Sequence, residues 1–243
     1  MTILDQIVNT KKTKLPNSLG ITHGIKPKPF LKKGKFQIIA EIKKGSPSLG
    51  LLKPDLDVAS TAAYYEENGA SAISVLTEED YFYGSTEDLK RVKKTVALPV
   101  LRKDFIFTKE QIVESYNLGA DAILLIVAVI KEADNLSILI KTAEELHLSV
   151  LVEIHDKSEL ETAVAAGAKI IGINNRNLKT FKTDINTSIE LIRSIPSHII
   201  SVSESGIHTQ DDLNSIISAG FDAALIGEAF IRNKEFLRDI KTP

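Results

Sequence analysis

The stretch "NLGADAILLI" (117–126) contains the pattern that decides the fold: a glycine, Gly119, followed within three residues by a short apolar run. The glycine can adopt the left-handed conformation that closes a helix. The apolar run is typical of a strand buried on both faces, as in a parallel sheet covered by helices. The same order recurs in "ENGASAISVL" (67–76), "AAGAKIIGIN" (165–174) and "SAGFDAALIG" (218–227). A repeated helix–glycine–strand unit predicts alternating helices and strands.

Further apolar runs between these repeats complete a set of eight predicted strands. The spacing of roughly 20 to 35 residues suits one βα unit per strand, and the chain length of 243 residues suits one closed (β/α)8 barrel. Helices are expected between the strands, for example at 55–69 and 157–167. We expect strands at 37–43, 72–77, 99–104, 122–127, 149–154, 170–174, 199–204 and 223–227.

The alternative α/β architecture is an open, doubly wound sheet. It lacks support, because no G-x-G-x-x-G motif follows the first predicted strand. Residues 1–35 differ from the rest of the chain: "ILDQIVNTKK" (3–12) has helical periodicity, and the stretch after it is punctuated by proline and glycine. We therefore predict an α/β protein with an N-terminal helix and loop extension over 1–35 and a barrel catalytic domain over 36–243.

Composition excludes several classes of function. The net charge of -2 comes without a long basic block, which argues against nucleic-acid binding. The cysteine count is zero, so neither a disulfide scaffold nor a thiolate nucleophile is available. The N-terminus lacks the apolar core of a signal peptide. The longest apolar run, 122–130, is about half the length that a bilayer requires. We expect a cytoplasmic protein with no membrane partner.

The stretch "AEIKKGSPSLG" (40–50) places charges where a buried strand ends. Glu41 and Lys43 are two residues apart and so project from the same face of the strand. Active sites of (β/α)8 barrels lie at the C-terminal ends of the strands, where Lys103 and Glu153 also fall. Charged side chains that share the partly desolvated opening at this end of a barrel must be paired with one another or with a ligand. Such mutual pairing suits acid–base chemistry near neutral pH. The other polar residues at predicted strand ends include Asn174, Arg176, Ser203, Glu204 and Ser205.

Glycines at the last two strand ends indicate a phosphate site. The seventh strand runs into "SESGI", with Gly206, and the eighth into "LIGEAF", with Gly227 and Glu228. Glycine lets backbone N–H groups approach an anion, and a short helix after the eighth strand can direct its positive end at it. Ser46, in the turn after the first strand, can supply a hydroxyl to the same anion.

No group of histidines and carboxylates has metal-ligand spacing, so no metal is expected. We expect the histidines in loops or at helix ends on the surface, with His155 alone close to a candidate site residue, Glu153. The histidines are His23, His147, His155, His198 and His208.

Motifs in order along the chain resemble those of the indole-3-glycerol phosphate synthase family, over essentially all of 36–232. The motifs are "IIAEIKKGSPSLG", "SVLTEEDYFYGSTEDL", "PVLRKDFI", "LGADAILLIVA", "LVEIHD", "IGINNRNLKTF", "VSESGI" and "LIGEAF". The resemblance implies closure of the pyrrole ring of 1-(2-carboxyphenylamino)-1-deoxyribulose 5-phosphate, with loss of CO₂ and water. It also implies that the N-terminal region helps to cover the active site.

The resemblance assigns roles to the charged residues. Lys103 matches the general acid that protonates the ketone oxygen of the substrate, and Glu153 matches a second acid–base group. Glu41 matches a base or orienting carboxylate. Lys43 matches a substrate contact and a candidate acid for dehydration, although the sequence leaves open which lysine serves which step.

The resemblance also implies substrate contacts. Asn174 should hydrogen-bond a substrate hydroxyl, Ser205 should orient polar groups, and Arg176 should face the anthranilate carboxylate. A hydrophobic wall should hold the aryl ring, although ordinary barrel packing explains two of its members, Leu124 and Ile126, equally well. The wall residues are Phe82, Phe105, Leu124 and Ile126. The implied partner is this small phosphosugar–anthranilate substrate alone, without a cofactor, and the oligomeric state stays open, with a monomer compatible.

Two other functions remain open at this point. One is a different phosphosugar enzyme, such as an isomerase or an aldolase that uses a lysine Schiff base; phosphoribosylanthranilate isomerase is disfavoured because it relies on a cysteine. The other is a barrel that binds a phosphorylated metabolite without turnover.

Overall fold

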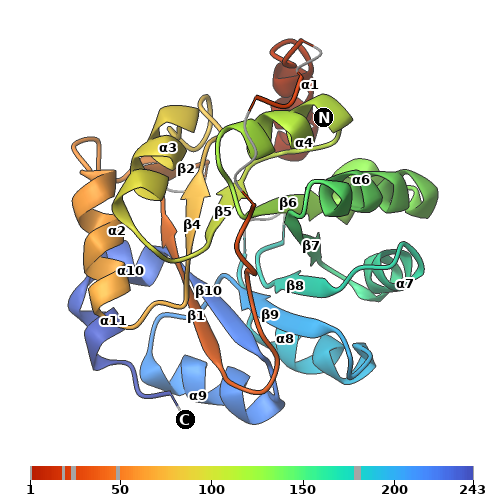
Figure 1. The fold of residues 1–243 in the computed structure, drawn as a ribbon. Coiled ribbons are helices and arrows are strands. Elements are labelled where there is room, and N and C mark those ends of the chain that lie inside the picture. The colour runs from red at the N-terminus through yellow and green to blue at the C-terminus, as the bar shows by residue number, and fades with distance from the viewer. Residues whose placement is uncertain (1, 18–19, 23–25, 48–49, 178–181, 243) are drawn as a thin grey trace.

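The predicted helix-ending glycines recur around a closed barrel. Gly69, Gly119, Gly167 and Gly220 have φ of 95°, 84°, 86° and 92°, and each precedes a barrel strand. The computed structural model describes residues 2–17, 20–22, 26–47, 50–177 and 182–242. Its eight parallel strands close in the order β1-β10-β9-β8-β7-β6-β5-β4, with helices outside them (Figure 1). The closed ring confirms the (β/α)8 prediction and excludes the open sheet.

Every predicted barrel strand is present, with ends that differ by no more than one residue. The strands are β1 Gln37–Ile42, β4 Ala72–Leu76, β5 Val100–Lys103, β6 Ala122–Ile126, β7 Ser149–Ile154, β8 Ile170–Asn174, β9 Ile200–Glu204 and β10 Ala223–Ile226. A short antiparallel pair that we did not predict, β2 Gly45–Ser46 and β3 Gly50–Leu51, follows β1.

Helices surround the barrel, and polar side chains cap the start of several of them. Asp57, Ser85 and Asp156 each accept a hydrogen bond from a backbone N–H in the first turn, which satisfies donors that a helix leaves free. The helices are α1 Ile3–Lys12, α2 Val58–Glu67, α3 Thr86–Thr95, α4 Lys109–Asn117, α5 Val127–Ile130, α6 Ala133–Glu145, α7 Lys157–Ala165, α8 Asn186–Leu191, the 3-10 helix η1 Ile192–Ser194, α9 Gln210–Ala219, α10 Glu228–Arg232 and α11 Glu235–Asp239.

Strand alternation divides the buried apolar residues into two cores. On β1, Ile39 faces the barrel interior while Ala40 and Ile42 pack under the helices. The outer core joins the strands to the helices. The inner core contains at least one residue from every barrel strand, including Ile39, Leu101, Leu124, Leu151, Val202 and Leu225. Because Glu41 and Lys103 lie two residues beyond Ile39 and Leu101, they also face inward, at the C-terminal mouth.

The N-terminal extension contacts both ends of the barrel. Helix α1 lies at the C-terminal mouth, where Ile3 lines the cavity described below. The chain then passes α4, where Asn117 exchanges hydrogen bonds with Gly20 and Thr22. Residues 26–35, which we call the bottom segment, cross the N-terminal ends of the strands (the red-orange trace across the barrel in Figure 1). Phe30 and Leu31 are buried in the inner core.

Two aspartates, both from the helix–glycine–strand repeats, fix the bottom segment; Asp121 is buried and Asp222 is partly buried. Asp121 accepts the backbone N–H of Lys28 at 2.8 Å, and Asp222 accepts the ammonium of Lys33 at 3.1 Å. Asp222 also accepts the backbone N–H of Ser201. These contacts close the end of the barrel opposite the charged mouth. Within the described residues, no helix has the length and apolarity needed to cross a membrane.

Candidate active site

Lys103 stands at the centre of a cluster of carboxylates at the C-terminal mouth. Its Nζ lies 3.8 Å from Oε2 of Glu41, 3.7 Å from Oε2 of Glu153 and 3.6 Å from Oε2 of Glu204. These four side chains come from β5, β1, β7 and β9, which the barrel brings together from distant parts of the sequence. All three carboxylates are buried.

The carboxylates hold Lys103 in its charged form. Burial disfavours the ammonium, but the surrounding carboxyl groups of Glu153, Glu204 and Glu41, led by Glu153, outweigh burial and raise the pKa of Lys103 above its ordinary value. A group in this state carries a proton at neutral pH, which is the form that an acid catalyst needs.

Glu41 and Lys43 form a tighter pair, with 2.9 Å between Oε1 and Nζ. Burial would raise the pKa of the Glu41 carboxyl, but the nearby Lys43 and Lys103 outweigh burial and lower it. Glu41 is therefore an ionised carboxylate, suited to act as a base or to orient a cationic group. The prediction that Glu41 and Lys43 project from one face is confirmed by this contact.

The pKa of Glu204 is shifted in the opposite direction from that of Glu41. Our prediction of the site did not include Glu204. Burial raises its pKa to about 8, against the opposing charge of Lys103, so it holds a proton at neutral pH. Neither of its carboxyl oxygens has a hydrogen-bond partner among the described residues. A signal was present in the sequence, because alternation along β9 puts Glu204 in phase with the apolar residue Val202, which faces the barrel interior.

Glu153 is held by neighbours from two elements. Asn174, at the end of β8, donates from Nδ2 to Oε1 of Glu153 at 3.2 Å. His155 places Nε2 3.5 Å from the same oxygen, and its side chain is only 14% exposed. The expectation of a surface position is therefore wrong for His155, because the residue turns inward between Glu153 and Glu159. His147, His198 and His208 are exposed as expected, while His23 lies outside the described residues.

The opposite rim combines backbone turns with an arginine. Ser205 and Gly206 both have positive φ, 66° and 81°, where the chain turns away from β9. Gly227 precedes α10, and a Cβ there would lie 2.5 Å from Oε1 of Glu41, so the backbone approaches the cluster closely. Arg176 lies 3.5 Å from the carboxylate of Glu228.

Apolar side chains form the remaining wall. The rings of Phe82 and Phe105 are 6.0 Å apart between centroids. Leu124 and Ile126 extend the wall and also belong to the inner core. These two residues therefore both pack inside the barrel and line the cavity.

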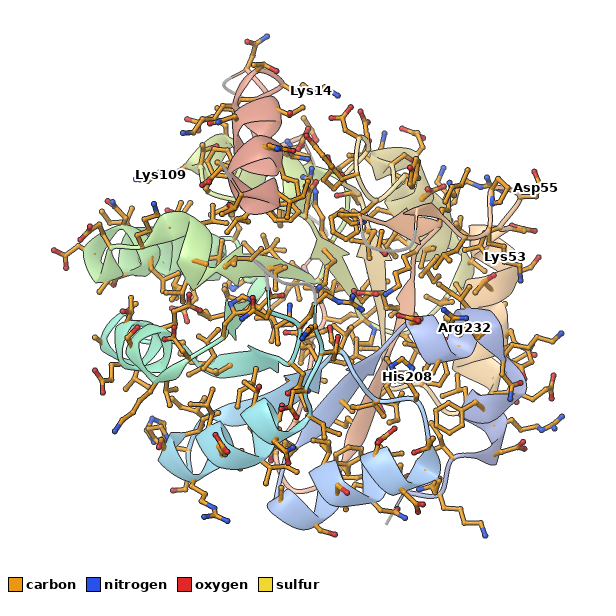
Figure 2. All side chains as sticks on the ribbon, turned by 180° about the vertical axis from the view of Figure 1, so that it is seen from behind. Lys14, Lys53, Asp55, Lys109, His208 and Arg232 are labelled. Atoms are coloured by element: carbon orange, nitrogen blue, oxygen red, sulfur yellow. The ribbon has the colours of Figure 1, made fainter. Side chains whose placement is uncertain are left out.

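Apart from His155 and Glu159, these site residues line one cavity of about 1130 Å³, counting the space open to solvent at its mouth. Every residue that we predicted for the site lines it. Helix α1 contributes apolar residues that the prediction did not include, namely Ile3, Leu4 and Ile7. Figure 2 shows His208, also a lining residue, over the middle of the barrel, and Lys53 and Asp55 at its edge. Within the described residues, no group of three or more His, Asp or Glu side chains is arranged to hold a metal ion.

Comparisons with known proteins agree with this geometry. The indole-3-glycerol phosphate synthase family model matches residues 17–242. The chain is 46% identical to the indole-3-glycerol phosphate synthase of Caldanaerobacter subterraneus subsp. tengcongensis, over 98% of this chain and 99% of that protein. It is 54% identical to the enzyme of the same name from Chlorobium chlorochromatii, over 79% and 74% of the two chains. For the enzyme of Thermoanaerobacter pseudethanolicus, the identity is 46% over 95% and 92%.

Proposed function

The chain belongs to the indole-3-glycerol phosphate synthase family, and from this premise we propose which of its residues carry out the reaction. The enzyme is a carboxy-lyase of tryptophan biosynthesis. It closes the pyrrole ring of 1-(2-carboxyphenylamino)-1-deoxyribulose 5-phosphate, releases CO₂ and removes water.

The observation that carries the assignment is the position of Lys103 among Glu41, Glu153 and Glu204, all within 3.8 Å. The ketone carbon becomes electrophilic when its oxygen receives a proton, and the aryl carbon then attacks it. Lys103 is the proton donor for that step. The adjacent carboxylates keep the amine charged between turnovers, so it is ready to donate when substrate arrives.

After ring closure, CO₂ leaves and a hydroxyl must depart as water. Glu153, next to Lys103, exchanges protons with the intermediate in these steps. The Glu41–Lys43 pair offers both a base and an acid within 2.9 Å of one another, which suits dehydration. Arg176 faces the anthranilate carboxylate without holding it tightly, because a group bound more strongly in the ground state would leave more slowly.

The phosphate lies at the rim formed by Ser46, Gly206 and Gly227. The first turn of α10 leaves backbone N–H groups without partners in the helix, and these can meet the anion. The carboxylate of Glu228 faces Arg176 and Arg232, so Glu228 contributes its backbone N–H. Asn174 hydrogen-bonds a substrate hydroxyl, and Ser205 orients polar groups. The aryl ring lies against Phe82, Phe105, Leu124 and Ile126.

The other expectations drawn from the sequence are also proposals. We propose that residues 1–35 form an extension to a catalytic domain over 36–243, and that the enzyme acts in the cytoplasm on its small-molecule substrate without nucleic acid. We propose that it works without a metal or cofactor, and that a monomer suffices because every proposed contact comes from one chain.

Turnover of the purified, metal-free protein tests these roles. The wild type should convert the carboxyphenylamino substrate with a rise in indole absorbance. Lys103→Ala and Glu153→Gln should each lose at least about 100-fold in kcat, as expected for a lost general acid or base, with an unchanged circular dichroism spectrum. Near-normal turnover of both folded variants would show that the roles are wrong.

A further inference from the structure

His155 forms a chain of contacts that the reaction as described above does not use. Its Nδ1 lies 3.1 Å from Oε2 of Glu159, and the same oxygen accepts the backbone N–H of His155 at 2.7 Å. These two contacts fix the ring. The other ring nitrogen, Nε2, is buried, has no hydrogen-bond partner among the described residues, and lies 3.5 Å from Oε1 of Glu153. A polar atom is rarely left in this state without a purpose.

The overall reaction consumes a proton that these contacts could provide. The substrate carries a carboxylate and a phosphate, whereas the product carries the phosphate alone. When the bond to the carboxylate breaks, CO₂ leaves and its electron pair stays with the ring system. The hydroxyl leaves as water with a proton from the enzyme. The balance is substrate trianion plus one proton giving product dianion, CO₂ and water, so each turnover draws one proton from outside.

We propose that His155 is a positioning residue that stores this proton and passes it from Nε2 to Glu153, which delivers it to the reacting groups. Glu159 holds Nδ1–H and so directs Nε2 at Glu153. Once product has left, solvent in the open cavity returns a proton to Glu153, which lines the cavity, and Glu153 passes it back to Nε2 of His155. The inference rests on the proposed acid–base role of Glu153.

The charged groups around His155 favour a stored proton. Three carboxyl groups face it, from β7, α7 and β9: Glu153, Glu159 and Glu204. Lys103 opposes them from β5, 3.7 Å beyond Glu153. Burial alone would lower the pKa of His155, but the hydrogen bond to Glu159 and the nearby carboxylates outweigh burial and raise it. The imidazolium form therefore persists to a higher pH than in an exposed histidine.

Single-turnover rates of His155→Ala measured between about pH 5.5 and 9 test the proposal. We expect the variant to be slower by about 10-fold where wild-type His155 is protonated, with substrate affinity unchanged. The ratio of wild-type to variant rate should fall toward one as pH rises through the pKa of His155. Added imidazole should restore the rate of the variant.

Two further variants complete the experiment. Glu159→Gln keeps a hydrogen-bond acceptor but removes a negative charge that raises the pKa of His155. The single-turnover rate of this variant should therefore begin to fall at a lower pH than that of the wild type. His198→Ala removes an exposed histidine and should match the wild type throughout.

A purely structural role for His155 gives a ratio that does not change with pH and no response to imidazole, and that result overturns the proposal. If Glu153→Gln is inactive while the ratio for His155→Ala does not change with pH, the proposed role of His155 is wrong and that of Glu153 stands. If Glu153→Gln keeps normal turnover, the proposed role of Glu153 fails first.

Discussion

The ammonium of Lys11, on α1, lies 2.6 Å from Oδ1 of Asp104, the residue that follows Lys103. Asp104 is buried and also pairs with Arg102 at 3.1 Å. Burial would raise the pKa of Asp104, but Arg102 and Lys11 outweigh it and lower the pKa. The contact therefore joins the helix that lines the top of the cavity to the strand that carries the proposed acid.

Lys11→Met should loosen α1 from the mouth. We expect KM to rise several-fold, because apolar residues of α1 line the cavity, and the free energy of unfolding to fall by about 1–3 kcal/mol, because a buried carboxylate loses one of its partners. Lys14→Met is the matched control, since Lys14 is 46% exposed and pairs with exposed acids. It should leave the free energy of unfolding nearly unchanged. Equal effects of the two variants on KM would contradict the prediction.

Glu204→Gln should make stability less dependent on pH. In the folded wild type, burial raises the pKa of Glu204 to about 8, whereas the unfolded chain loses that proton near its ordinary value of 4.5. Between these two values the folded state binds more protons, so wild-type stability falls as pH rises. The variant lacks this loss and should be more stable than the wild type above pH 8.

Chemical denaturation at a series of pH values measures the effect of this substitution. The advantage of Glu204→Gln over the wild type should be smallest at the acid end and grow as pH rises. An advantage that stays constant with pH would mean that Glu204 is ionised in the folded protein.

Gly227→Ala should lower turnover without unfolding the protein. A Cβ at this position would lie 2.5 Å from Oε1 and 3.0 Å from Cβ of Glu41, so the carboxylate must move away from Lys43 and Lys103. We expect kcat to fall by at least about 10-fold, because small displacements in an active site are costly. The control is Gly20→Ala, where a Cβ meets nothing within 4 Å, and its kinetics should match the wild type.

Asp121→Ala should destabilise the barrel at the end far from the mouth. Asp121 accepts hydrogen bonds from the backbone N–H groups of Lys28 and Val100 and from the ammonium of Lys93. Losing them leaves the buried N–H of Val100 unsatisfied and removes two partly buried contacts, at an expected cost of about 2–4 kcal/mol in the free energy of unfolding. Asp55→Ala, at an exposed position, should cost less than about 0.5 kcal/mol. Thermal unfolding of both variants checks the difference, and a similar small cost for both would contradict it.

Much of the fold could be predicted because the barrel repeats one local pattern. The glycine conformation at Gly119 and its counterparts is a local property, and a buried strand such as β6 is continuously apolar. The β2–β3 pair was not predicted, because its strands have two residues each and no apolar alternation. Helix α5 was missed for the opposite reason: Val127–Ile130 continues the apolar run of β6 without a break.

The placement of the site residues could be predicted because parallel strands end at one mouth, which brings Glu41, Lys103 and Glu153 together whatever their separation in sequence. The state of Glu204 could not, since it depends on burial and on charges from three other strands. The inward turn of His155 depends on Glu159, which lies one helical turn into the next element. Such contacts arise only when the chain is folded.

The bottom segment also constrains the order in which the protein can be completed. Ribosomes release residues 26–35 long before Asp222, which accepts the ammonium of Lys33. Until then, Phe30 and Leu31 have no finished interior to enter and remain exposed on a nascent chain. The segment made near the beginning must therefore wait for the last strand before it can dock, which leaves an apolar stretch open to chaperones or to aggregation throughout synthesis.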